Sequence, residues 1–262
     1  MSPAPSTLRG GQLLRVATYN IHKGVRGLGP RKRLEIHNLV LGIEALDADM
    51  VFLQEVRHSN RADARRFPDT HIGWPRLPQA DYLAPEGYAV AYRTNAITRF
   101  GEHGNALLSR WPLGDAGHHD VSDHRFEQRG LLHVPVQWRE TTLHAVVAHL
   151  GLMHSGRVRQ VERLARFVAA EVPPDVPLIV AGDFNDWGEK LDAPMRHSGL
   201  TRAVVEGARG SRVNTFPSRV PVFSLDRIYT RGLRCVSTSV PRGAAWARMS
   251  DHLPLVAELE LA

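Results

Sequence analysis

Residues 178–186 read Leu-Ile-Val-Ala-Gly-Asp-Phe-Asn-Asp, an apolar run that ends in carboxylate and amide side chains. The length of the run and its β-branched content are typical of a buried strand. In layered α/β proteins, polar side chains at strand ends converge on a shared pocket. The stretch therefore predicts a strand at 178–181 that is followed by two candidate site residues, Asp183 and Asn185.

Eight further runs are strand-like in the same way, and two other segments have the apolar spacing of amphipathic helices. The predicted strands are residues 13–19, 50–53, 88–92, 106–108, 131–138, 143–150, 225–229 and 253–261. One predicted helix lies between Arg31 and Leu46, and the other begins near Ser155 as an N-cap and stops before Pro173. Many strands with few helices predict sheets that are covered by helices.

The stretch from residue 13 to residue 262 contains no internal repeat and no linker-like segment. We therefore expect a single domain over 13–262, preceded by an N-terminal tail over 1–12. Within the domain, the segments 57–86 and 199–222 are poor in strands and rich in Pro, Gly and Arg. Loops of that length in a compact domain are often functional.

The composition excludes several classes of protein. With 43% hydrophobic and 23% charged residues, the chain is neither globally disordered nor fibrous. Cys235 is the single cysteine, which excludes an intramolecular disulfide and a Cys-rich zinc site. The first twelve residues contain no signal-like apolar run, and nowhere are 18 consecutive residues apolar. We therefore expect a soluble cytoplasmic protein without a transmembrane segment.

The net charge of +6 is unevenly distributed along the chain. Residues 1–34 carry +7, residues 57–66 carry +3 and residues 196–219 carry +4. Positive charge that is gathered in a few segments can steer an anionic ligand. Three solvated loops would explain the same distribution, and an excess of Arg over Lys fits codon composition as well as it fits phosphate recognition.

Polar side chains also stand beside five other predicted strands. They are Asn20, Glu55, His149, Asp226, Asp251 and His252. Together with Asp183 and Asn185 they form a set rich in oxygen ligands, which suits Mg²⁺ or Mn²⁺ rather than zinc. A hard ion held by one or two carboxylates keeps positions for water and phosphate oxygens, as phosphoester hydrolysis requires.

Taken singly, each of these residues has an ordinary structural explanation. Glu55 can form a salt bridge with Arg57, and Asp226 can form one with Arg227. His149 can be a core histidine with its hydrogen bonds satisfied. The whole set, placed in short motifs at strand ends, is not explained by turn chemistry.

In their order along the chain, these motifs resemble the endonuclease/exonuclease/phosphatase superfamily, which includes DNase I, AP endonucleases, neutral sphingomyelinases and inositol-polyphosphate phosphatases. The resemblance runs from Tyr19-Asn20, through Gly-Asp-Phe-Asn at 182–185, to Ser-Asp-His at 250–252, and covers nearly the whole chain after residue 13. It implies a DNase I-like fold, a four-layer α/β sandwich of two facing mixed β-sheets flanked by helices. The site would lie at one edge of the sheets.

The resemblance also implies a role for each matching residue. Glu55 would be the principal metal ligand, with Asn20 close by and Asp251 able to join. Asp183 would orient or activate the attacking water, helped by Asn185.

Two histidines would face the phosphate. His252, which we expect to pair with Asp226, would contact the scissile phosphate. His149 takes the position of the phosphate-contacting histidine of the DNase I and sphingomyelinase branches. AP endonucleases have a different pattern there, so we do not expect cleavage at abasic sites.

Two arginines are weaker candidates for substrate binding. Arg57 follows Gln-Glu-Val as an arginine does in DNase I, and a salt bridge is an equal expectation. Arg129 begins a strand and can reach the substrate, although we expect it at the surface. The segment 118–124 is rich in His and Asp, and we expect it to be an exposed polar loop rather than a metal cluster.

The sequence thus predicts a Mg²⁺- or Mn²⁺-dependent phosphodiester hydrolase that acts by in-line attack of an activated water on phosphorus. Nucleic acid is the favoured substrate, and a monomer is expected. One alternative is a phosphodiesterase or phosphatase acting on a phospholipid or a small phosphoester. The sequence shows no exposed apolar hairpin or amphipathic anchor, which weakens lipid action. A second alternative is a binding module that kept the fold without the chemistry.

Overall fold

The computed structural model describes residues 13–27, 29–68, 72–124, 127–205 and 213–262. The predicted tail, residues 1–12, lies outside the described residues, and the single domain over 13–262 stays a prediction. None of the described helices is both long enough and apolar enough to cross a membrane.

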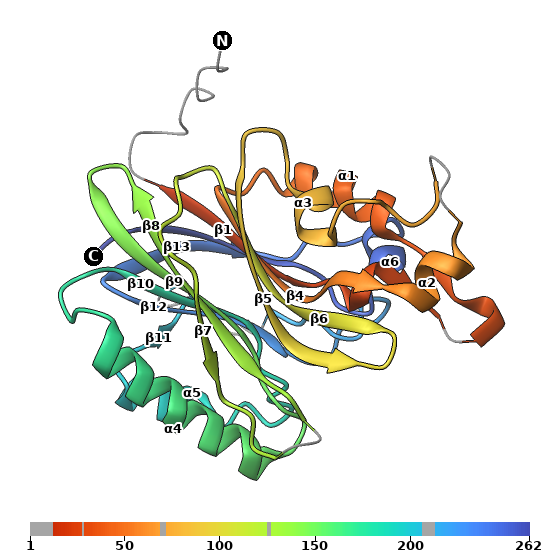
Figure 1. Cartoon of the computed structure of the whole chain (residues 1–262). Coiled ribbons are helices and arrows are strands. Elements are labelled where there is room, and N and C mark those ends of the chain that lie inside the picture. Colours follow the sequence, from red (N-terminus) through yellow and green to blue (C-terminus); the bar gives the residue numbers. More distant parts are fainter. Residues whose placement is uncertain (1–12, 28, 69–71, 125–126, 206–212) are drawn as a thin grey trace.

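Two six-stranded sheets form the centre of the molecule (Figure 1). The first sheet has the order β13 (Leu233–Ser239), β14 (Leu255–Leu261), β1 (Leu14–Asn20), β4 (Met50–Asn60), β6 (Gly101–Ser109) and β5 (Ala89–Thr98). The second has the order β11 (Thr201–Arg202), β12 (Asp226–Arg231), β10 (Leu178–Asp183), β9 (Thr141–His149), β8 (Gly130–Trp138) and β7 (Gly117–Asp120). Both are mixed, because β1 runs parallel to β4 and β9 runs parallel to β10, whereas the other pairs are antiparallel.

A continuous apolar cluster fills the space between the two sheets. Its members come from alternate positions of the central strands, for example Val16 and Phe52 from the first sheet and Val147 and Ile179 from the second. This alternation turns every second side chain inward. The sheets therefore face each other across a shared core.

Helices cover the outer face of each sheet (Figure 1). The first sheet packs against α1 (Ile36–Leu46), α3 (Gln79–Leu83) and α6 (Trp246–Met249), and the second against α4 (His154–Glu171) and α5 (Asp192–His197). A short helix, α2 (Arg61–Arg66), follows β4, and the small ribbon of β2 (Val25–Arg26) and β3 (Arg33–Leu34) precedes α1. The predicted four-layer sandwich of two mixed sheets flanked by helices is confirmed.

The α1 and α4 helices follow from the apolar spacing in the sequence. Ile36, Leu39 and Ile43 are buried on α1, and Val161 and Leu164 are buried on α4. Burial of such a stripe against a sheet supplies most of the stability of a short helix.

The start of α4 differs from the prediction. The helix begins at His154, so Ser155 lies inside its first turn and is not the N-cap. Arg157 donates to the carbonyl oxygens of Gly151 and Leu152, and Gln160 accepts from the Gly151 N–H at 2.8 Å. Side chains of the helix thus fix the entering chain in place of a cap.

Three edge strands of the two large sheets, β7, β11 and β13, and parts of β4, β5 and β6 were not predicted. His118 and Asp120 are exposed as expected but lie on β7 and not in a loop, and β13 pairs with β14 although its sequence is polar. Edge strands carry polar side chains on both faces, so they lack the alternation that identifies inner strands. The predicted strand at 50–53 continues to Asn60, and the segments 57–86 and 199–222 contain α2, α3 and β11.

A buried histidine pair on the outer face of the second sheet makes the fold sensitive to acid. His133 Nε2 lies 2.7 Å from His144 Nδ1, and the Phe167 ring of α4 lies 5.2 Å from the His133 ring. Burial, reinforced by His144 and by His119, lowers the pKa of His133 to about 4. The unfolded chain, in which the pKa is near 6.5, binds this proton more readily.

The neutral His133 imidazole therefore contributes to the free energy of unfolding above pH 6.5, and we expect this contribution to be lost as the pH falls toward 4. The free energy of unfolding, measured with urea, should fall between pH 7.5 and pH 5 by about 1 to 2 kcal/mol less in His133→Gln than in the wild type. His197→Gln, at an exposed histidine of α5, is the matched control and should keep the whole loss. Equal losses in both variants would contradict the assignment.

Candidate functional site

Polar side chains from both sheets meet at one edge of the sandwich. Asp183 ends β10, where it lies directly across from His149 on β9 and from Asp226 on β12. Asn20 ends β1 in the first sheet and donates from Nδ2 to Asp183 Oδ2 at 3.0 Å. Strand ends of the two facing sheets thus build a single cluster, as the sequence predicts.

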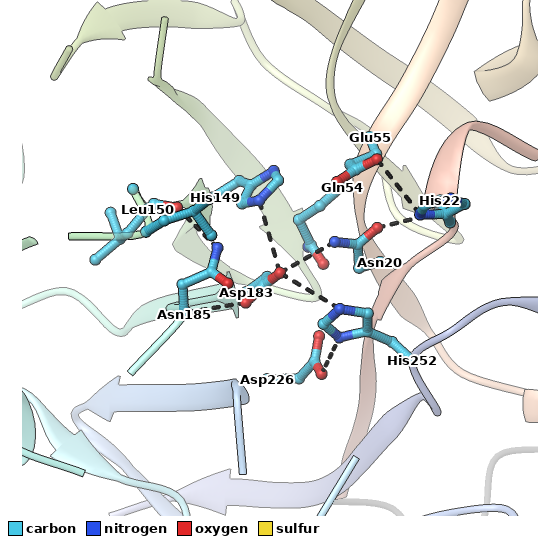
Figure 2. A network of polar contacts seen from close by, with 12 residues as sticks. Asn20, His22, Gln54, Glu55, His149, Leu150, Asp183, Asn185, Asp226 and His252 are labelled. Carbon is cyan, nitrogen blue, oxygen red and sulfur yellow. Dashed lines mark hydrogen bonds and ion pairs between the residues drawn. The ribbon is translucent and has the colours of Figure 1, made fainter. Parts of the chain in front are cut away.

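Asp183 is the centre of this cluster (Figure 2). The Nε2 atoms of His149 and His252 lie 3.6 and 3.7 Å from its Oδ2 atom. The backbone N–H of Asn185 donates to Oδ1 at 2.9 Å. Burial raises the pKa of this carboxyl, although the two imidazoles act in the opposite direction. Asp183 is therefore a buried carboxylate of increased basicity, oriented by fixed donors.

The backbone around Asp183 explains its Gly-Asp-Phe-Asn sequence. Gly182 has a φ of +156°, and a Cβ there would lie 1.8 Å from the carbonyl oxygen of Ala148. Asn185 has a φ of +48°, a region that Asn adopts more readily than most residues. Its Nδ2 donates to the Leu150 carbonyl at 3.0 Å, which ties the turn after β10 to the end of β9.

His252 is held between two carboxylates (Figure 2). Its Nδ1 donates to Asp226 Oδ2 at 2.8 Å, and the Thr215 hydroxyl donates to the same oxygen at 2.6 Å. Burial alone would lower the pKa of His252, but Asp226 and Asp183 raise it to about 10. The imidazole is therefore a fixed cation at neutral pH. The predicted pairing of His252 with Asp226 is present.

Glu55 points into the site because its strand is irregular. The register between β4 and β6 shifts between Leu53 and Val56, and Glu55 has a φ of +57°. A β-bulge of this kind re-aims a side chain next to a functional site. Glu55 therefore lies within β4 and not after it.

Lys23 and His22 lie beside the carboxylates of Glu55 and Asp251. Lys23 Nζ is 2.9 Å from Glu55 Oε2, and His22 Nδ1 is 4.0 Å from that atom and 3.3 Å from Asp251 Oδ2. Although burial raises the pKa of Glu55, Lys23 and His149 hold it well below its usual range. Glu55 Oε2 is buried and is already paired with the Lys23 ammonium group. A buried carboxylate that holds a cation, with the Asp251 carboxylate near the same His22 side chain, offers the oxygen ligands that a divalent cation prefers.

A second group of buried atoms can also hold a metal ion. One ligand atom each of Asp183, Asp226 and His252 lies within 4.8 Å of the others. In this arrangement His252 Nδ1 is already engaged by Asp226, and a protonated imidazole repels a cation. The oxygen set of Glu55, Asp251 and Asn20 is therefore the better fit to Mg²⁺ or Mn²⁺.

On the other side of Asp183, His149 is buried and Arg129 is half-buried. Burial lowers the pKa of His149 to about 4, and the positive charge of Arg129 contributes to this shift. The imidazole is therefore neutral at neutral pH. Only 15% of the Arg129 side chain is exposed, and its Nε is buried without a partner. The expected surface position of Arg129 is therefore wrong. Arg129 directly precedes β8, and its guanidinium lies 3.9 Å from Glu127 and acts on His149 through its charge.

The simple ion pairs considered from the sequence are not the ones that form. Arg57 forms its ion pair with Asp63 and lies over the Trp74 ring, 5.8 Å from its centroid. Arg227 is fully buried and contacts Asp186 at 2.9 Å instead of Asp226. These pairings depend on how the chain folds back, which neighbouring positions in the sequence do not reveal. Substrate contact by Arg57 stays a prediction.

Four residues of the site were not assigned from the sequence. His22 and Lys23 follow Asn20 in a turn with positive φ at both residues, so their direction depends on that turn. Thr215 positions Asp226 from a distant segment. Asn105 of β6 donates to the carbonyls of Gly130 and Val147 at 2.9 and 3.1 Å and links the two sheets. The only signal for the last two is that Gly-Asn-Ala-Leu-Leu-Ser-Arg at 104–110 and Thr-Phe-Pro-Ser at 215–218 resemble segments of the same superfamily.

An exposed apolar hairpin stands beside the site, contrary to the prediction. Phe216 and Phe223 pair across it, and Val220 and Val222 are 68% and 55% exposed. Trp187 packs against both aromatic rings, and the Phe216 ring lies 4.8 Å from that of His252. Pro and Arg interrupt the apolar residues of this segment, so its sequence does not show the pattern of an apolar hairpin.

Comparison with known proteins identifies the family of the chain. The model of the Endonuclease/Exonuclease/phosphatase family matches residues 17–252. The Escherichia coli protein YbhP, itself uncharacterized, is 34% identical over 251 residues, which cover 94% of this chain and 96% of YbhP.

Solved structures share the fold at lower identity. The endonuclease/exonuclease/phosphatase from Beutenbergia cavernae is 22% identical, with a TM-score of 0.71 over 96% of this chain and 72% of that one. D. rerio TDP2 in complex with a single-strand DNA product is 18% identical, with a TM-score of 0.65 over 95% and 99% of the two chains. The matched span includes the site from Asn20 to His252, and the chain belongs to the Endonuclease/Exonuclease/phosphatase family.

Proposed function

We propose that this protein is a divalent-metal-dependent phosphodiester hydrolase in which Asp183 orients and deprotonates a water that attacks phosphorus in line. The observation that carries the proposal is the buried, basic Asp183 carboxylate, fixed by Asn20 and Asn185 between two imidazoles. A carboxylate in such surroundings is suited to accept a proton from water. His252 and His149 stand on either side, where they can donate to phosphoryl oxygens.

Glu55 would hold the metal ion, with Asp251 and Asn20 as further oxygen donors. When bound, the ion would neutralise charge on the phosphate and lower the pKa of water. Lys23 and His22, which contact these carboxylates in the structure, would move aside or turn to the substrate. Mg²⁺ or Mn²⁺ as the ion, a cytoplasmic location and a monomeric state stay predictions.

Replacement of Asp226 by Asn should lower kcat about 100-fold. Asp226 accepts from both His252 and Thr215, and an amide cannot hold the imidazolium by charge. Because Asp226 acts through His252, the loss should lie in kcat more than in KM on bis(p-nitrophenyl) phosphate. Asp115→Asn, at an exposed position, is the control. A kcat within threefold of the wild type would refute this positioning role.

Nucleic acid is the substrate class that we propose first. Positive charge borders the site, and the TDP2 structure of the same fold contains a single-strand DNA product. The test offers single- and double-stranded DNA, RNA, a phospholipid and inositol phosphates to the purified protein with Mg²⁺ or Mn²⁺. Cleavage of DNA or RNA with the highest kcat/KM is the expected result. Binding of all of them without hydrolysis would support the binding-module alternative instead.

A phospholipid or small phosphoester is the second candidate substrate. The exposed surface of Trp187, Val220, Val222 and Phe223 beside His252 favours this candidate, because such a surface can hold an apolar group next to a scissile phosphate. Salt separates the two candidates. Affinity for a nucleic acid should fall steeply with ionic strength, whereas affinity for a neutral headgroup should change little.

A further inference from the structure

A pocket of about 650 Å³ next to the candidate site is lined almost entirely by cations. Its lining residues are Arg26, Gly27, Arg31, Lys32, Arg33 and Arg219. No carboxylate and no aromatic ring is among them. We call this feature the basic pocket.

Two distant segments of the chain build the basic pocket. Residues 26–33 belong to the β2 and β3 ribbon and its connection, whereas Arg219 belongs to the apolar hairpin that follows Thr215. These are parts of the first and third cationic segments of the sequence. Their charges therefore gather at one place, which a set of unrelated solvated loops would not require.

Hydrogen bonds connect the basic pocket to the candidate site. Arg26 Nη1 donates to the Ser250 carbonyl at 3.1 Å, and the Ser218 N–H donates to the Asp251 carbonyl at 2.7 Å. Both acceptors belong to the Ser-Asp-His motif that carries His252. A ligand group in the pocket would thus lie beside a phosphate bound at His252.

The charges of the pocket are only partly compensated. Arg33 Nε is 3.5 Å from Glu35, and Lys32 pairs with Asp63. Within the described part of the chain, Arg31 and Arg219 form no ion pair and no side-chain hydrogen bond. Burial and the nearby Arg219 lower the pKa of Arg26, although Asp251 and Glu35 act in the opposite direction.

Planar guanidinium groups bind phosphate through paired charge-assisted hydrogen bonds. Among the described lining residues there is no aromatic ring on which a base could stack and no aliphatic side chain that would line an acyl chain. We propose that the basic pocket binds a second phosphate group of the substrate, adjacent to the phosphodiester that is cleaved. This inference rests on the proposed hydrolase function. The second phosphate can belong to a nucleic-acid strand or to a small polyphosphorylated molecule.

The test compares a substrate with several phosphates and a substrate with one. In Arg31→Ala/Arg219→Ala, kcat/KM for a short oligonucleotide relative to that for bis(p-nitrophenyl) phosphate should fall roughly 10- to 100-fold, mainly through KM. The slope of log K for oligonucleotide binding against log salt concentration should also become shallower, by about 1 for each lost contact. Arg166→Ala/Arg196→Ala removes two exposed cations of α4 and α5 and should preserve both values. An unchanged ratio in the pocket variant would overturn the proposal.

Binding measurements test the proposal for the pocket separately from the proposed hydrolase function. In an Asp183→Ala background, fluorescence anisotropy of a labelled oligonucleotide should show weaker binding when Arg31 and Arg219 are also replaced, even if the wild type hydrolyses nothing. Inositol hexakisphosphate is added as a competitor. If inositol hexakisphosphate displaces the oligonucleotide only when the two arginines are present, the pocket binds small polyphosphates. If replacing the arginines lowers oligonucleotide affinity without any such competition, the pocket binds a nucleic-acid strand. Equal affinity for both probes with and without the arginines would refute the pocket as a phosphate site.

Discussion

Asp183→Ala should abolish phosphodiester hydrolysis, with a fall in kcat of roughly 10⁴-fold. This carboxylate is the one group that contacts Asn20, Asn185, His149 and His252 together. Its removal takes away the proposed base and also the partner that orients the two imidazoles. Losses of groups that act as a unit are not additive, so the single change should cost nearly as much as removal of the whole set.

Asp183→Asn separates charge from shape in the same position. The amide can still accept from the Asn185 N–H, but it cannot accept a proton from water. We expect it to be almost as inactive as the alanine variant on bis(p-nitrophenyl) phosphate, with an unchanged circular dichroism spectrum. Asp175→Ala, at an exposed carboxylate, is the control. Turnover above a tenth of the wild-type rate in a folded Asp183→Asn protein would show that another group activates the water.

The sequence predicted most of the sandwich because its inner strands are apolar on at least one face. Val16, Phe52 and Ile179 belong to short runs whose burial between sheets the pattern already required. The polar ends of the same runs fixed the positions of Asn20, His149 and Asp183. Where a buried apolar strand ends, the next polar residue lies at the edge of the sheet. The same apolar runs therefore predicted both the strands and the site residues at their ends.

The parts that the sequence did not predict depend on backbone geometry or on contacts between distant segments. A bulge and a positive φ aim Glu55 inward, and no property of Gln-Glu-Val marks them. The basic pocket requires Arg26 and Arg219, 193 positions apart in the numbering, to face the same space. Arg129 was expected at the surface, because a single Arg at a strand start carries no signal of burial. Such features become visible only once the chain path is known.

Glu55→Gln should raise the metal concentration needed for half-maximal activity by roughly 100-fold or more. Replacement of groups that merely support metal ligands costs about 10- to 100-fold in affinity, and a direct ligand should cost at least as much. The neutral amide keeps the size of the side chain and one oxygen donor, so excess Mg²⁺ or Mn²⁺ should restore part of the activity. Wild-type protein in EDTA should be inactive, and activity in EDTA would refute metal dependence altogether.

A readout that does not use activity makes the Glu55 prediction specific. Isothermal titration with Mn²⁺, or the shift of Tm with Mn²⁺, should show binding to the wild type and to Glu44→Gln, an exposed control on α1, and weak binding to Glu55→Gln. The alternative metal group of Asp183, Asp226 and His252 predicts the opposite pattern, in which Asp226→Asn loses binding and Glu55→Gln retains it. The two variants measured side by side therefore decide which carboxylates hold the ion, because each removes one charge from only one of the two groups.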